Sequence, residues 1–305
     1  MKTKLIGLLV PGLSALMFIA HGQGVPQTAA EIKQLAAGLK YQQGEIKLKD
    51  NLATLQVPAN FKYLDAQDAR TVLVKLWGNP PAQAQDTLGL LMPADKTPLD
   101  TDCWVVTIEY ANDGFVKDGD AGKINYDDLL KQMQAGVSKN NKARTDKGYP
   151  AIELVDWAAP PHYDAAAHKL YWAKDLKFEG EANDTLNYDI RILGRRGVLV
   201  LSAVANLNQL ADIQNQMPQI LGMVDFSQGN RYADFDPKSD KVAAYGIAAL
   251  VAGGVAAKLG FFKLIWVFIV AAKKFIIIAC VAVAAWFRKI HWKIFKRRSS
   301  VGPTA

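Results

Sequence analysis

Cysteine is scarce in this sequence. The 305 residues contain two, Cys103 and Cys280, and Cys280 lies in an apolar stretch near the C-terminus. Cys103 is therefore alone in the central region, which excludes an internal disulfide and a cysteine metal cage there. The sequence also lacks an HExxH pair, a phosphate-binding loop and a serine nucleophile elbow, so no motif indicates catalysis, and no cofactor or metal is expected.

Acidic residues are absent from both ends of the chain. Residues 1–24 and 242–305 hold no Asp or Glu but 12 of the 36 Lys and Arg residues. The other 24 basic residues are outnumbered by 29 acidic ones in residues 25–241, so the net charge of +7 comes from the ends. A negatively charged central region argues against a nucleic-acid partner, and the basic ends suit a membrane instead.

Residues 1–24 have the pattern of a signal peptide. Lys2 and Lys4 precede an apolar run from Leu5 to Ala20, and small residues follow where a signal peptidase would cut. An uncleaved anchor is the alternative. Either interpretation sends residues 25–241 across the cytoplasmic (inner) membrane, so we expect this region to be an exported, periplasmic domain.

Residues 242–287 contain no acid and are interrupted only by lysines, which predicts a membrane anchor of one or two transmembrane helices. The first piece, Val242 to Phe262, is long enough to cross the bilayer. Gly246 and Gly253 belong to a seam of small residues along it, against which a second helix could pack closely.

The second apolar piece is interrupted by Lys273 and Lys274. Trp266 and Trp286 lie twenty residues apart, so their rings would be about 30 Å apart, one at each membrane interface. Two crossings would leave the basic tail, residues 288–305, outside, whereas one crossing leaves it in the cytoplasm, as the positive-inside tendency favours. A segment that is apolar on every side makes a poor interfacial helix, which favours a hairpin of two crossings, and both topologies stay open.

The central region mixes helix and strand signals. Helices are expected from a capping box at Thr28 to Glu31, from a cap at Asp65, and over residues 125–141 and 208–224. Strands are expected in a hairpin over 44–58 with its turn at residues 49–51, and over 103–111, 149–158, 168–178, 185–193 and 198–205. This pattern predicts an α+β fold, a largely antiparallel sheet packed with helices.

The two histidines of the central region are candidates for a ligand-binding or acid/base site. His162 and His168 bracket Asp164, and a hairpin turn between them would bring the three side chains together. The spacing fits no standard metal motif, and a polar turn after Pro160 and Pro161 would have the same sequence without any chemistry.

Arg195 and Arg196 form a second candidate, because two guanidinium groups beside flexible glycines suit a phosphate or a carboxylate. Arginines at a loop tip are equally compatible with simple solvation. A third stretch, beginning at Asp118 and Asp120, resembles a calcium loop at first, but Gly122 comes one residue early and no entering helix is expected. An acidic turn before a helix is the simpler interpretation.

Several stretches taken together resemble one family. They are NLATLQVPANFKYLDAQDA, DGFVKDGDAGKINYDDLLKQM, GYPAIELVDWAAPPHYDAAAHKLYWAKDL, LNYDIRILGRRGVLVL and GNRYADFDPKSDKVAAYGIAALVAGGVAAK. This sequence is similar there to the membrane-anchored bacterial proteins grouped as domain of unknown function 2167, over about residues 40 to 260. The resemblance implies an exported domain tied to the inner membrane and carries over no catalytic residue. The strand order also loosely resembles the Mog1 and PsbP type of α/β/α sandwich, which is an analogy of fold alone.

These observations favour a non-enzymatic envelope module that binds a protein, a peptide or another envelope ligand and is fixed in the lipid bilayer. The alternative is an envelope hydrolase or metal-dependent enzyme that uses His162, Asp164 and His168. Transport or signal transmission through the anchor is a third hypothesis, and it depends on Lys273 and Lys274 alone.

Overall fold

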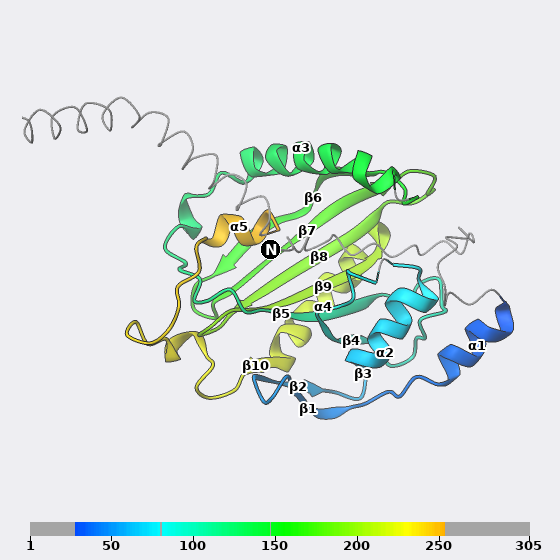
Figure 1. Ribbon diagram of the computed structural model, residues 1–305, viewed down its shortest axis with the longest axis horizontal. Helices are drawn as coiled ribbons and strands as arrows, with labels where there is room; N and C mark the ends of the chain where they lie inside the picture. Colours follow the sequence, from blue (N-terminus) through cyan, green and yellow to red (C-terminus); the bar gives the residue numbers. More distant parts are fainter. Residues whose placement is uncertain (1–27, 80, 147, 254–305) are drawn as a thin grey trace, which may run out of the picture. The chain divides into compact units, whose positions relative to one another are not determined.

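The computed structural model describes residues 28–79, 81–146 and 148–253, and their strands form two antiparallel sheets (Figure 1). The larger sheet has the order β3 (Phe61–Asp65), β4 (Thr87–Pro93), β5 (Val105–Ala111), β9 (Val198–Asn206), β8 (Thr185–Leu193), β7 (Lys169–Phe178) and β6 (Ile152–Asp164). The smaller sheet has the order β1 (Gly44–Leu48), β2 (Ala53–Val57) and β10 (Val224–Phe226). With the helices packed on these sheets, the predicted α+β class is confirmed.

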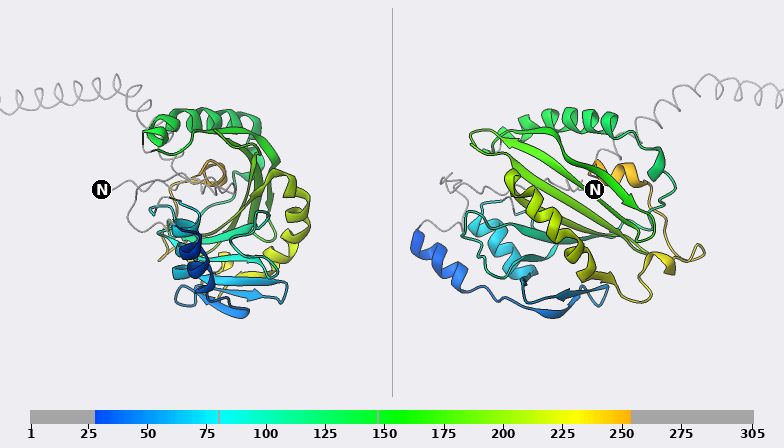
Figure 2. Two further views of the ribbon diagram at one scale, coloured as in Figure 1. Left: turned by 90° about the vertical axis from the view of Figure 1, so that its right-hand side faces the viewer. Right: turned by 180° about the vertical axis from the view of Figure 1, so that it is seen from behind.

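Helices cover both faces of the seven-stranded sheet. The helices of the described ranges are α1 (Ala29–Ala37), α2 (Ala66–Arg70) with its π-helical continuation (Thr71–Leu76), α3 (Tyr126–Thr145), α4 (Leu210–Met223) and α5 (Ile247–Val251). Short 3₁₀ turns occur at Ala121–Lys123, Leu207–Gln209 and Tyr232–Asp234. Figures 1 and 2 show α2, α3 and α5 on one face and α4 on the other.

Local sequence signals begin several of these elements as expected. The Thr28 hydroxyl accepts from the Glu31 N–H while the Glu31 carboxylate accepts from the Thr28 N–H, which completes the predicted capping box. The Asp65 carboxylate caps α2, and the Asn125 side chain caps α3. Lys49, Asp50 and Asn51 all have positive φ in the β1–β2 turn, which the predicted hairpin requires.

The two faces of the large sheet have different cores. On one face, α4 and β2 bury Ile213, Met217 and Leu55 against the sheet. On the other face, three separate clusters lie under α2, α5 and α3 in turn, around Leu90, Leu170 and Phe178 respectively. The part of this second face between the clusters is lined by polar side chains.

Three strands were not predicted. β3 runs directly into the α2 cap at Asp65, β4 contains Gly89 and Pro93 in a short run, and β10 has three residues. Each is too short or too broken to show period-two alternation, so only pairing with a neighbouring strand defines it. β10 also follows α4 directly, so α4 does not lead into a membrane segment as expected.

The segment from Val242 to Gly253 packs on the sheet, which corrects the predicted start of the membrane anchor. Val242 forms a bridge with Phe115, and Ile247, Leu250 and Val251 of α5 lie in the apolar cluster around Leu170. Gly246 fits closely against Asp120, and Gly253 follows the C-cap of α5 with a φ of 82°. The prediction that a crossing begins at Val242 along a seam through these glycines is therefore wrong for residues 242–253.

Within the described ranges, no helix combines the length and the apolarity that a membrane crossing requires. The predicted signal peptide, the rest of the anchor with Trp266, Lys273, Lys274 and Trp286, and the basic tail lie outside these ranges.

Candidate functional site

Most buried polar side chains gather on one face of the large sheet. Of the eight in the described part of the chain, all but Asn79 belong to this set, which we call the polar strip: Thr87, Thr107, Lys174, Asn187, Asp189, Arg191 and Ser202. Strand pairing aligns them, since Ser202 lies opposite both Thr107 and Asp189, and Lys174 lies opposite Asn187. The strip thus runs across β4, β5, β9, β8 and β7, on the face that carries α2, α3 and α5.

Asp189 is the centre of the strip and makes three polar contacts. The Lys174 ammonium lies 2.7 Å from Oδ2, Arg191 Nη2 lies 3.2 Å from Oδ1, and the Ser202 hydroxyl donates to Oδ1 at 2.7 Å. Burial alone would raise the pKa of Asp189, but the charges of Lys174 and Arg191 and the hydrogen bonds outweigh it, so the pKa is lowered. Asp189 therefore stays ionised in the sheet interior.

Two buried groups of the strip face have neither a hydrogen-bond partner nor an ion-pair partner among the described residues. They are Trp172 Nε1 and Thr87 Oγ1, and both residues are 1% exposed. Arg191 lies over the Trp172 ring with its guanidinium carbon 4.9 Å from the ring centroid. Native proteins rarely leave such groups unsatisfied, and each costs about 1 to 3 kcal/mol. Each of the two groups therefore calls for a partner that the described residues do not supply.

Glu109 on β5 extends the strip toward β4, where it pairs in register with Thr87. Burial raises the pKa of Glu109 to about 7; Arg191 opposes this shift, whereas Asp86 and Asp189 add to it. Its carboxyl group is therefore partly protonated at neutral pH.

A matched pair of threonine substitutions tests whether the Thr87 hydroxyl lacks a hydrogen-bond partner in the folded protein. Thr87→Val should raise the free energy of unfolding by about 1 kcal/mol, because the change removes an unsatisfied buried hydroxyl at nearly constant volume. Thr107→Val should lower it by about 1 kcal/mol, since the Thr107 hydroxyl donates to the Ser202 carbonyl at 3.4 Å. Urea denaturation measures both, and a loss of stability in Thr87→Val would show that its hydroxyl has a partner in solution.

His168 lies in the turn between β6 and β7 but faces residues far away in sequence. Its Nδ1 is 3.5 Å from Asp118 Oδ2 and 3.3 Å from the Tyr163 hydroxyl, and its ring stacks on Tyr232. The Tyr163 hydroxyl in turn donates to Asp118 at 2.6 Å. His162 points to the opposite face, where its ring contacts Tyr171. The predicted trio is thus divided, and His168 has Asp118 as its carboxylate partner.

Asp164 has a local role in the same turn, because its carboxylate accepts from the N–H groups of Ala166 and Ala167. In the calcium-like stretch, the Asp120 carboxylate accepts from the N–H group of Ile247 at 3.2 Å, so it helps to hold the start of α5 in place. Across the described ranges, no group of three or more His, Cys, Asp or Glu side chains is arranged to hold a metal ion.

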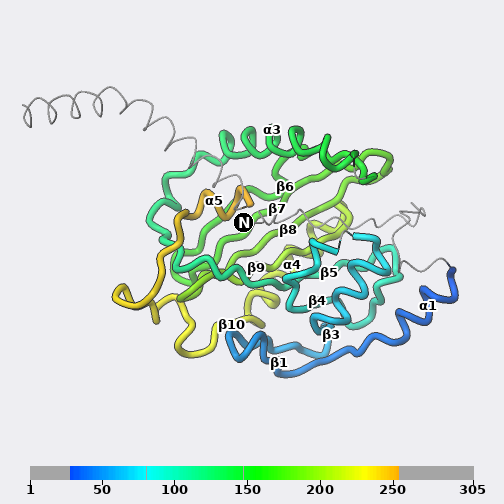
Figure 3. Tube along the Cα trace, viewed as in Figure 1, coloured from blue at the N-terminus to red at the C-terminus, as the bar shows by residue number. Residues whose placement is uncertain are grey.

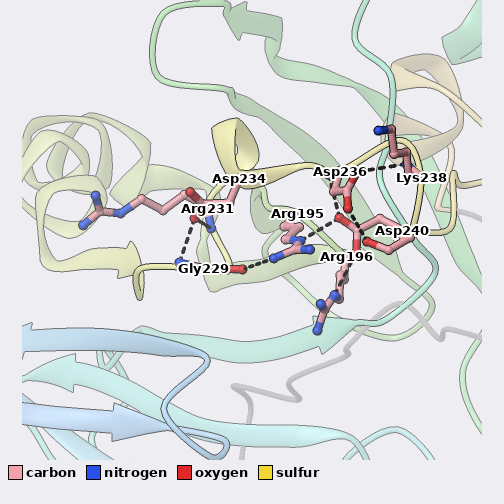
Figure 4. Close-up of polar contacts among 9 residues, drawn as sticks. Arg195, Arg196, Gly229, Arg231, Asp234, Asp236, Lys238 and Asp240 are labelled. Atoms are coloured by element: carbon pink, nitrogen blue, oxygen red, sulfur yellow. Dashed lines mark hydrogen bonds and ion pairs between the residues drawn. The ribbon is translucent and has the colours of Figure 1, made fainter.

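Arg195 and Arg196 lie in the β8–β9 turn, and both bind Asp240 (Figure 4). Arg195 Nε lies 2.6 Å from Asp240 Oδ2, and Arg196 Nε lies 3.1 Å from Oδ1. The hydrogen bond from Arg195 and the one from the Asp236 N–H are the main reasons why the pKa of Asp240 falls to about 2. Both arginines therefore bind the segment that follows β10 to the β8–β9 turn of the sheet. Figure 3 shows the path of that segment from β10 to α5.

The two predicted sites lie at one end of the sheet, since the Leu193 N–H donates to the His168 carbonyl at 3.0 Å. The polar strip, in contrast, was not predicted as a site. Its signal in the sequence is the alternation Asn187, Asp189, Arg191 along β8, which is also the signal of a solvent-exposed strand face.

Fold and site together define an α+β protein with a charged, buried strip on its main antiparallel sheet. Residues 40–284 match the family described as "Protein of unknown function (DUF2167)", and the chain belongs to this family. No curated protein matches the sequence.

Two solved structures are similar at low identity. PsbP (CyanoP) from Synechocystis sp. PCC 6803 has 7% identity and a TM-score of 0.34, with 62% of this chain and 92% of that chain covered. The Ran-binding protein Mog1p of Saccharomyces cerevisiae has 9% identity and a TM-score of 0.32, with 62% and 96% covered. The α+β assignment depends on the strands and helices described above.

Proposed function

We propose that this protein is a membrane-anchored module of the bacterial cell envelope that binds a ligand through the polar strip and catalyses no reaction. One observation carries the binding role: seven buried polar side chains share one sheet face, and Trp172 Nε1 and Thr87 Oγ1 beside or within the strip are unpartnered. Buried polar groups cost folding free energy unless hydrogen bonds satisfy them, and a bound ligand would satisfy the two groups that the protein leaves unpartnered.

The anchor is proposed from the sequence of the chain ends. Because residues 242–253 belong to the domain, about 30 apolar residues remain before the basic tail, enough for one crossing of about 20 residues but short for two. A single crossing between Trp266 and Trp286 would leave the tail in the cytoplasm, which agrees with the positive-inside tendency. The domain would then face the periplasm.

The second candidate is an enzyme that uses His168 as an acid or base. Its support is the Asp118 carboxylate beside His168 Nδ1, which would orient the ring, and the Tyr163 hydroxyl within hydrogen-bond reach. His168 also has a positive φ of 51°, a strained conformation for a residue with a side chain. No nucleophile of lowered pKa adjoins this cluster in the described ranges, so we favour the binding role.

Retention of a ligand by the native protein tests the proposal. Full-length protein is extracted from its own membranes after an alkaline wash, and the compounds that denaturation releases are identified by mass spectrometry. The wild type should remain in the washed membranes and release a compound that Arg191→Lys does not, because lysine cannot reproduce the guanidinium fork. A chain ending at Gly253 should be lost in the wash.

Two further variants serve as controls. Arg144→Lys changes the same residue type on α3, away from the strip, and should release the compound as the wild type does. His168→Gln should also release it, whereas its loss in this variant alone would favour the enzyme. If wild type and Arg191→Lys release the same compounds, the strip is not the binding site.

A further inference from the structure

The β7–β8 part of the polar strip has more positive than negative charge. Lys174 and Arg191 are both paired with Asp189, so two cations share one carboxylate in a buried setting. Both side chains are about nine-tenths buried, which leaves little solvent to neutralise the second cation. A buried, uncompensated charge is strongly unfavourable, and a bound counter-ion removes the imbalance.

Hydrogen-bond donors are also in surplus there. Lys174 has three N–H groups and Arg191 has five; Arg191 donates to Asp189, and Lys174 forms an ion pair with it. Arg191 Nη1 also donates to the carbonyl groups of Ile190 and Leu201. Trp172 Nε1 is a donor without any partner in the described part of the chain, and the Trp172 position is opposite Asp189 in the strand register.

Glu109 on β5 also acts on Arg191, but below neutral pH it does not cancel the excess of positive charge. Glu109 has a pKa of about 7 because of its burial, so at pH 6 it is mainly neutral. Asp189 and Asp86 are the acidic groups that act on Glu109, and Arg191 is the basic one.

We infer that this part of the strip is an anion subsite, in which Lys174, Arg191 and Trp172 Nε1 bind the carboxylate or phosphate group of the ligand. The inference rests on the proposed binding role and names the chemical class of the group that is bound. A carboxylate or a phosphate supplies the acceptors that the surplus donors lack, and charge-assisted hydrogen bonds of this kind are the strong ones. A lipid headgroup, a phosphorylated metabolite and a peptide C-terminus all carry such a group.

The test is stabilisation of the full-length protein in detergent by inorganic phosphate or by acetate at pH 6, with sodium chloride holding the ionic strength constant. Either anion should raise the unfolding temperature in a saturable manner. Lys174→Met removes the surplus charge and should weaken the apparent affinity about tenfold or more. Trp172→Phe, which removes the unpartnered donor, should weaken it in the same direction and serves if Lys174→Met does not fold.

Lys169→Met is the matched control, because Lys169 lies on the same strand but on the other face, where its ammonium donates to the Leu221 carbonyl. It should respond to both anions as the wild type does. A stronger response to phosphate indicates a phosphorylated compound or headgroup, and a stronger response to acetate indicates a carboxylate. Equal responses in wild type, Lys174→Met and Trp172→Phe, or no response in the wild type, would overturn the anion subsite. Ligand retention that depends on Arg191 would still support the binding role in that case.

Discussion

Asp189→Leu is expected to lower the free energy of unfolding by about 3 to 5 kcal/mol, the largest effect of any single change in the strip. The substitution removes the only carboxylate that contacts both Lys174 and Arg191 among the described residues, and it leaves two buried cations side by side. Urea denaturation of the full-length protein in detergent measures the loss.

A triple variant separates the charge effect from packing. Replacing Lys174 and Arg191 by methionine together with Asp189→Leu should recover most of the stability, because apolar groups of similar size need no compensating partner. If Asp189→Leu costs less than about 1 kcal/mol, water reaches Lys174 and Arg191 and the strip is not buried in solution.

Glu109→Gln is expected to flatten the pH dependence of stability between pH 4.5 and 7. Burial raises the pKa of Glu109 from 4.5 to about 7, so in this window the folded protein holds a proton that the unfolded chain has lost. Raising the pH through the window therefore costs the wild type stability, at about 1.4 kcal/mol per pH unit and about 3 kcal/mol in all. The glutamine side chain does not titrate in this window, so Glu109→Gln should not lose this stability.

The measurement is the free energy of unfolding at pH 4.5, 6 and 7.5 for the wild type and for Glu109→Gln. The two proteins should differ least at pH 4.5 and most at pH 7.5, where the variant should be the more stable. Asp118 and Asp240 have lowered pKa values, so their contributions are present above the ordinary carboxyl range and are lost at lower pH, outside this window. Parallel profiles for the two proteins would contradict the raised pKa of Glu109.

The polar strip differs from the β6–β7 and β8–β9 turns in what its polar contacts do. At the turns, the Asp164 carboxylate caps its own turn, and Arg195 and Arg196 bind Asp240, so these predicted residues hold the chain in place. In the strip, paired charges coexist with unpartnered donors, and this combination is the one that a ligand can complete. The binding role is therefore proposed for the strip.

Much of the local structure could be predicted from the sequence. The capping box at Thr28, the caps at Asp65 and Asn125 and the turn at Lys49 to Asn51 all depend on residues within a few positions of one another, so their chemistry is visible in a short window. The antiparallel α+β class follows from hairpins of the same local kind. The unequal distribution of charge between the ends and the central region is likewise a property of sequence alone.

Only the tertiary structure decided where the polar residues face. Along β8, Asn187, Asp189 and Arg191 alternate with apolar residues, and this pattern is the same whether the polar face meets water or meets the charged groups of neighbouring strands. Likewise, the apolar run from Val242 to Val251 suits a bilayer and a protein core equally, because both are media of low polarity. The sequence pattern shows which side chains must leave water, and contacts with segments distant in sequence decide what those side chains pack against.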